Sequence, residues 1–250
     1  MSRFANHSAG VSYSFGPGPI TPGVKWLLIA NIVVYVFQQI YPPLTGYFGL
    51  SPQLVLEGLW IWQPLSYLFL HDPGGVFHIL FNMLILWMFG VTLERMWGTQ
   101  FFLKYYFIAG IGAGLTVILV GLLPFAATAP TYYALTIGAS GAIYGLLLAF
   151  AVYFPDRPIL MFFLFPVPAK YFVMILGAIA LLSGPGGRVS NAAHLGGLIV
   201  GYLYLKGGTG GGGGLTAEIK YRYLKWKMNR LRRKFDVYSG GRSDYDRNVH

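Results

Sequence analysis

Long runs of apolar residues recur along this chain and constrain its fold more than any other feature. A helix needs about 20 apolar residues to cross roughly 30 Å of hydrocarbon. Six runs approach that length, the last three at the short end: 24–41, 77–93, 102–123, 138–154, 170–183 and 191–206. Because Pro166 and Pro168 interrupt the stretch before the fifth run, residues 158–169 are expected to lie at the membrane interface. We predict an all-α membrane protein with six transmembrane helices.

Composition supports a protein that crosses the membrane several times. Only 10% of the residues are charged and 55% are hydrophobic, whereas soluble domains carry about 25% charged residues. The absence of cysteine excludes a disulfide framework, a thiolate metal site and a cysteine nucleophile. Residues 1–23 lack an apolar core, so no cleavable signal peptide is expected.

Basic residues predict how the chain is oriented. With both termini in the cytosol, only Arg188 among the 18 Lys and Arg residues lies on an external loop. This distribution follows the positive-inside rule. We expect a multi-pass protein of a prokaryotic cytoplasmic membrane; an organellar membrane stays open as the alternative.

The longest predicted external connection, residues 42–76, is aromatic and contains no Lys or Arg. Trp and Tyr favour the membrane interface, so this first external loop is expected to be half-embedded there. An ordinary aromatic anchor and a direct role in catalysis both remain open. His71, beside Asp72, is expected to be solvated.

The chain divides into four parts on composition. A cytosolic segment, 1–23, precedes the six-span core, 24–206. A glycine-rich linker, 207–214, then leads to a basic cytosolic tail, 215–250. The tail is expected to rest on the anionic cytosolic leaflet, with a solvated, topology-fixing tail as the alternative. Because this charge follows the positive-inside pattern, nucleic acid is not an expected partner.

Two polar residues stand inside apolar runs, each among glycine and alanine. Ser140 begins the fourth run and His194 lies in the sixth. Such groups are costly at membrane depth and are functional-site candidates by default. A lone membrane serine more often bonds to a carbonyl one turn earlier, so its chemistry depends on what lies beside it.

Glycines offer a way to bring the two residues together. Gly141 and Gly145 form one small face beside Ser140, and Gly197 and Gly201 form another beyond His194. Matching small faces let two helices approach closely. We expect this approach to place the serine hydroxyl within hydrogen-bond reach of the imidazole.

An adjacent neutral imidazole makes serine a competent nucleophile by accepting its proton. Tyr144, one turn after Ser140, is expected to pack on the His194 ring. All eight acidic residues fall in loops, span ends or the tail, which favours a serine–histidine dyad over a triad. Ala142 replaces the last glycine of G-x-S-x-G. No metal-binding pattern accompanies the histidines.

His78 and Asn82 lie four residues apart and therefore share a helix face. Their side chains carry hydrogen-bond donors that an oxyanion hole requires. The alternative is a polar pair that joins two helices.

The ordered set of motifs resembles the rhomboid family of intramembrane serine proteases over residues 24–206. The matching segments are Gly138-Ala139-Ser140-Gly141 with Tyr144, Ala193-His194-Leu195-Gly196-Gly197, and His78-Ile79-Leu80-Phe81-Asn82-Met83, with Trp62-Gln63, Phe69-Leu70-His71, Glu94 and Gly98 as further family-like positions.

This resemblance implies roles for the residues. Ser140 would be the nucleophile and His194 the general base and acid, with Tyr144 stacked on the latter. His78, Asn82 and the backbone N–H of Ser140 would line the oxyanion hole. The family cleaves transmembrane segments of other proteins, which reach the site near the fifth span, and needs no cofactor or metal.

Two other functions remain open. Rhomboid-like proteins that bind membrane clients without cutting them, derlins among them, typically lack the serine or the histidine, and this chain keeps both. A small transporter or channel would use His78, Asn82 and His194 to line a solute path, and would give Ser140 no special reactivity.

Overall fold

The computed structural model describes residues 16–161, 164–183 and 191–207. In this part of the chain, six helices have 14 or more residues: α1 (Pro22–Ile40), α5 (Val76–Trp97), α6 (Thr99–Gly121), α8 (Ser140–Tyr153), α9 (Ala169–Leu182) and α10 (Asn191–Lys206). Their bounds agree with the six predicted apolar runs to within a few residues. Helices α1, α5 and α6 are long and apolar enough to cross a membrane, whereas α8 and α9 are apolar but shorter.

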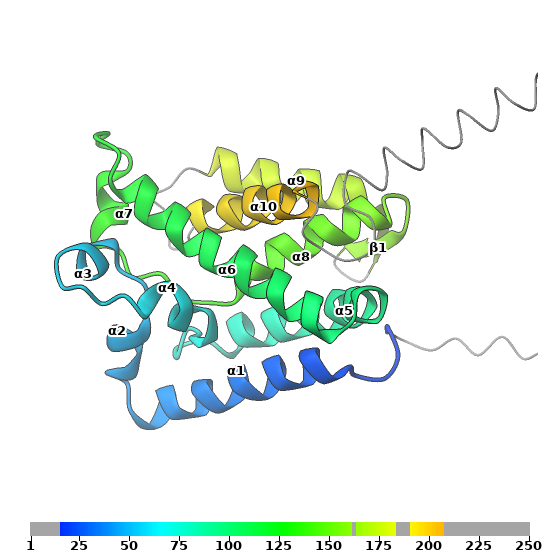
Figure 1. Ribbon diagram of the computed structural model, residues 1–250, viewed down its shortest axis with the longest axis horizontal. Coiled ribbons are helices and arrows are strands. Elements are labelled where there is room, and N and C mark those ends of the chain that lie inside the picture. Colours follow the sequence, from blue (N-terminus) through cyan, green and yellow to red (C-terminus); the bar gives the residue numbers. More distant parts are fainter. Residues whose placement is uncertain (1–15, 162–163, 184–190, 208–250) are drawn as a thin grey trace, which may run out of the picture.

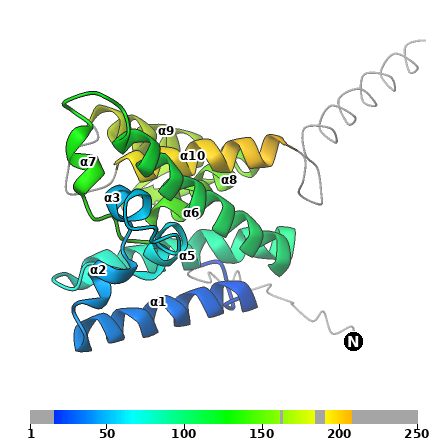
Figure 2. The same ribbon diagram turned by 60° about the vertical axis from the view of Figure 1, so that its left-hand side comes forward.

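Helix α6 is the centre of the arrangement. It packs against α1 and α5 on one side and against α8 and α10 on the other. Helix α9 lies at the periphery and packs on α8 and α10 (Figures 1 and 2). Four short helices lie toward one end of the bundle, on the left of Figure 1: α2 (Leu44–Phe48), α3 (Pro52–Leu56), α4 (Gln63–Ser66) and α7 (Ala129–Tyr133).

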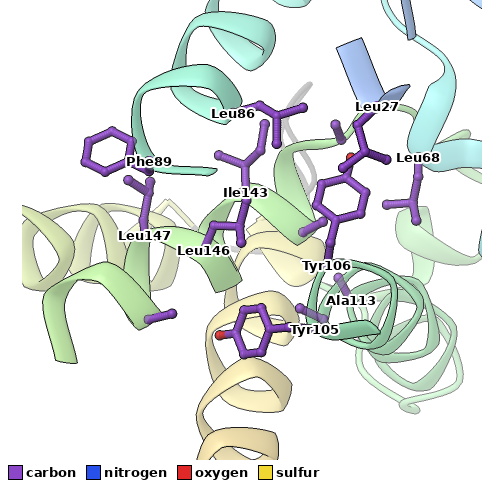
Figure 3. Packing of buried hydrophobic residues seen from close by; sticks show 14 of the residues in the cluster. Leu27, Leu68, Leu86, Phe89, Tyr105, Tyr106, Ala113, Ile143, Leu146 and Leu147 are labelled. Atoms are coloured by element: carbon purple, nitrogen blue, oxygen red, sulfur yellow. The ribbon is translucent and has the colours of Figure 1, made fainter. Parts of the chain in front are cut away.

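The core forms where α5, α6 and α8 meet. Leu86 and Phe89 of α5 face Ile143 and Leu147 of α8, while Tyr105 of α6 fills the space toward α10 (Figure 3). Large apolar side chains also point outward along the bundle, and Leu182 is 85% exposed. Apolar side chains on the outside and a close-packed interior fit a bundle surrounded by lipid.

The loop 42–76, predicted to be the first external loop, packs against the bundle on one side only. After α4, a single 3₁₀ turn, η1 (Tyr67–Phe69), buries Tyr67 and Leu68 completely. Leu59 and Ile61 remain 71% and 77% exposed. An isolated bridge pairs Leu50 with Thr136, so this loop also holds the segment that leads into α8.

Two expectations are corrected. The segment 158–169 contains an antiparallel hairpin, β1 (Pro158–Met161) with β2 (Phe165–Pro168), so the protein is mostly helical rather than all-α. Its prolines are accommodated because this two-stranded sheet consists only of edges. His71 is not solvated but fully buried. Burial, followed by the nearby His78, lowers the pKa of His71 to about 3.

Most of segment 1–23, all but the first residue of linker 207–214 and the whole basic tail 215–250 lie outside the described residues.

Candidate active site

Ser140 is the first residue of α8, so its backbone N–H belongs to the helix end whose amides have no intrahelical acceptor. The residues just before Ser140 pack closely against the first loop. Gly138 has a φ of +120° and donates its N–H to the carbonyl oxygen of Tyr67 at 2.9 Å. This positive φ favours glycine, and the bond to the first loop fixes where α8 starts.

His194 lies in the first turn of α10, and only 8% of its surface is exposed. Its Nε2 lies 2.9 Å from Ser140 Oγ, although 54 residues separate them in sequence. This is hydrogen-bond distance. The expected approach of the serine to the histidine is therefore present in the structure.

Glycines make this contact possible, because α8 and α10 touch through their backbones. A methyl group on Gly197 would overlap with the carbonyl oxygen of Gly141. A Cβ on Gly201 would lie 3.2 Å from Gly145 Cα, and one on Gly145 would lie 3.2 Å from the carbonyl oxygen of Gly197. A larger residue at Gly197 would therefore force the two helices apart, and one at Gly145 or Gly201 would require neighbouring atoms to shift.

Tyr144 covers one face of the imidazole. Its ring stacks on His194 with a centroid separation of 4.1 Å and an interplanar angle of 6°. An offset or stacked aromatic pair is worth about 0.5–1.5 kcal/mol beyond its buried area. This packing restricts the imidazole to the plane in which Nε2 meets the serine hydroxyl.

His78 and Asn82 approach the same region from α5. A Cβ on Gly138 would lie 3.0 Å from His78 Nε2, so this nitrogen lies over the backbone two residues before Ser140. Asn82 donates one amide hydrogen to the carbonyl oxygen of His78 at 2.8 Å. Its second amide hydrogen is the one that a substrate oxyanion would have to use.

Asp72 lies beside His78, whereas Glu94 lies away from the dyad. Glu94 is near the other end of α5 from His78, and it accepts hydrogen bonds from Thr21, Gly23, Val24 and Thr99. No group of three potential metal ligands occurs among the described residues. The site thus offers a nucleophile, a base and N–H donors. The bonds from Thr21, Gly23 and Val24 to Glu94 were not predictable from the sequence, because each joins residues at least 70 positions apart.

Comparison with known proteins agrees with this geometry. Residues 59–208 match the Rhomboid domain. Rhomboid protease AarA of Providencia stuartii is 33% identical over 71% of this chain and 69% of its own length. Rhomboid protease GlpG of Haemophilus influenzae is 29% identical over 69% of this chain and 83% of its own. Rhomboid protein 1, mitochondrial, of Saccharomyces cerevisiae is 36% identical over 51% of this chain, but only over 36% of its own length.

A helical membrane bundle with a serine beside a histidine defines the class, an intramembrane serine endopeptidase. The chain belongs to the rhomboid family. It is accordingly an integral membrane protein and a protease.

Proposed function

We propose that this protein cleaves transmembrane segments of other membrane proteins with a Ser140–His194 dyad. The observation that carries the proposal is the 2.9 Å contact between Ser140 Oγ and His194 Nε2 in a half-buried setting. The backbone contact of α8 with α10 supports it, since this contact leaves the pair little freedom to separate.

The reaction follows from the positions of the donors and acceptors. His194 Nε2 takes the hydroxyl proton as Ser140 Oγ bonds to the scissile carbonyl carbon. His194 then passes this proton to the leaving amine, and the C–N bond breaks. Water attacks the acyl-enzyme in the same way and restores the serine. No cofactor or metal takes part.

The tetrahedral intermediate needs donors for its negative oxygen. His78, Asn82 and the backbone N–H of Ser140 are assigned to this oxyanion hole. The N–H of a first helical residue is free for such use, and His78 Nε2 lies against Gly138. Loss of one oxyanion donor typically lowers kcat by about 10²–10³.

We also propose how the protein lies in the membrane. All six long helices cross the bilayer, both termini lie in the cytosol, and the first external loop lies half-embedded in the outer leaflet. Ser140, His194 and His78 each stand in the first turn of α8, α10 and α5, respectively. The three helices start on the outer side in this topology, so the site opens to external water.

We propose two kinds of partner: transmembrane substrates and the lipid surface of the cytosolic leaflet. Substrates reach the dyad near α9, the peripheral helix. The basic tail 215–250 rests on the anionic cytosolic leaflet, which its eight Lys and Arg residues between Lys220 and Lys234 favour.

The test is labelling of the detergent-solubilised protein with a fluorophosphonate probe, alongside cleavage of a transmembrane substrate. Ser140→Ala and His194→Ala are expected to abolish both signals while the proteins stay folded. Ser66→Ala is the matched control, because its exposed hydroxyl only donates to the carbonyl oxygen of Phe48.

Substantial residual cleavage in either dyad variant would contradict the assignment. A folded wild type that binds membrane proteins without labelling or cleavage would favour client binding.

A further inference from the structure

Gln38, near the outer end of α1, is a buried polar residue outside the proposed catalytic groups. Its side-chain amide pairs with both backbone groups of His71. Gln38 Oε1 accepts the His71 N–H at 3.0 Å, and Nε2 donates to the His71 carbonyl oxygen at 3.0 Å. Nε2 also donates to Thr45 Oγ1 at 2.8 Å. The first helix therefore holds the end of this loop at a defined position.

The next residue of the loop contacts His78 directly. The backbone N–H of Asp72 donates to His78 Nδ1 at 3.1 Å. Because a backbone N–H can only donate, Nδ1 must be the unprotonated nitrogen of the neutral ring. The ring proton is then on Nε2, the nitrogen that lies against Gly138.

This tautomer is the one that an oxyanion donor needs. In the opposite tautomer, Nδ1–H would oppose the N–H of Asp72, and the Nε2 lone pair would face the developing negative charge. The buried ring of His71 packs edge-on against His78, with centroids 5.1 Å apart. The hydrogen bonds of Gln38 with His71 and of Asp72 with His78 thus set both the position of the loop and the protonated nitrogen of the His78 ring.

We propose that Gln38 is a positioning residue for the reaction. It fixes His71 and Asp72 so that the Asp72 amide keeps His78 as an Nε2–H donor toward the oxyanion. This inference rests on the proposed oxyanion role of His78, and Gln38 itself touches no reacting atom.

The test compares Gln38→Met with Gln39→Met in the full-length protein. Methionine keeps the length of the glutamine side chain and removes its three hydrogen bonds. Gln39 is the matched control, because it is exposed and its side-chain amide makes only a long, 3.4 Å bond to the Pro73 carbonyl oxygen. We expect Gln38→Met to lower kcat by roughly 10-fold to 100-fold, somewhat less than loss of the donor itself. KM should change by less than about 2-fold, because ground-state binding does not use the oxyanion hole. Gln39→Met should match the wild type.

Two further readouts separate positioning from simple destabilisation. In a His78→Ala background, Gln38→Met should cause no further loss of kcat, since the donor it positions is gone. Affinity for a peptidyl boronate, whose tetrahedral adduct carries the oxyanion, should fall in parallel with kcat. Nitrogen NMR of labelled histidine should show protonated Nε2 at His78 in the wild type and a mixture of tautomers in Gln38→Met.

The outcomes are distinguishable. An additive effect of Gln38→Met on His78→Ala, or an unchanged kcat, would overturn the positioning role. An unchanged kcat in His78→Ala alone would instead refute the oxyanion assignment on which the inference rests. Should Gln38→Met fail to fold, the same cycle is run with Thr45→Val, which leaves both bonds between Gln38 and His71 in place and removes only the acceptor at 2.8 Å from Gln38 Nε2. This variant should show a smaller loss that also vanishes beside His78→Ala.

Discussion

At the scale of single residues, the distance between Ser140 and His194 is set by glycines rather than by the two residues themselves. The carbonyl oxygen of Gly141 occupies the space where Gly197 would carry a side chain. The separation of the two helices is therefore a backbone distance, which side-chain rotation cannot adjust.

Gly197→Ala tests this dependence. The added methyl group must push α10 away from α8, and overpacking of this kind costs about 1–3 kcal/mol. We expect kcat to fall by at least about 100-fold and the unfolding temperature to drop, as measured by substrate cleavage and thermal unfolding in detergent. Gly177→Ala in α9 is the control, because its Cβ would make only an ordinary 3.4 Å contact with Leu198. Equal activity in the two variants would contradict the role of the contact.

His71 predicts a pH dependence of stability. Burial lowers its pKa in the folded protein to about 3, while the unfolded value stays near 6.5. Between these values the unfolded chain binds the extra proton, so stability falls as pH decreases, by up to about 1.4 kcal/mol per pH unit. We expect the unfolding temperature to be flat above pH 7 and to decrease below about pH 6.

The control for this effect is His71→Leu, which removes the titrating group but keeps an apolar side chain. Its unfolding temperature should depend less steeply on pH between about 6 and 4. An identical slope in both proteins would show that another group titrates.

At the scale of elements, the long helices were predictable and their connections were not. Within the described residues, apolar runs located all six helices of 14 or more residues, because lipid-facing and core-facing positions are both apolar. The hairpin at 158–168 was missed because its prolines and aromatic residues also suit an interfacial segment. The burial of His71 was missed because it depends on Gln38, 33 residues earlier in the chain.

The candidate site likewise has features that were predictable from the sequence and features that were not. Sequence motifs placed Ser140, His194 and Tyr144 in one neighbourhood, and the structure brings these three side chains together. The partners of Asn82 and His78 were not predictable, because a hydrogen bond to a backbone group leaves no mark in the sequence. Their catalytic roles remain predictions.

Glu94 joins three elements near the C-terminal end of α5. Its carboxylate accepts the N–H groups of Gly23 and Val24 at 2.8 and 2.9 Å, and the hydroxyl of Thr99 at 2.6 Å. A carboxylate is favourable at a helix N-terminus, here that of α1. We expect Glu94→Ala to lower the free energy of unfolding by about 3 kcal/mol, since buried donors lose a charged acceptor.

Glu57→Ala is the comparison for this variant. The Glu57 side chain is exposed and bonds to Tyr132 and Gln53 at the surface. Its loss should cost less than about 1 kcal/mol. Similar unfolding curves for the two variants would show that Glu94 does not hold the helices together.

At the scale of the whole molecule, the absence of cysteine makes topology directly measurable. Gly46→Cys in the first external loop has open space around the new side chain. Gln100→Cys is exposed at the opposite end of the bundle, at the start of α6. A membrane-impermeant maleimide should label Gly46→Cys on intact cells, and Gln100→Cys only after permeabilisation. The reverse pattern would invert the proposed orientation.

The length of α8 has a consequence for the surrounding lipid. Its 14 residues rise about 21 Å at 1.5 Å per residue, against roughly 30 Å of hydrocarbon. In the proposed topology, a helix this short either starts beneath the outer surface or thins the bilayer around it. Hydrophobic mismatch therefore links the depth of Ser140 to the lipids of the host membrane, and acyl-chain length becomes a determinant of turnover.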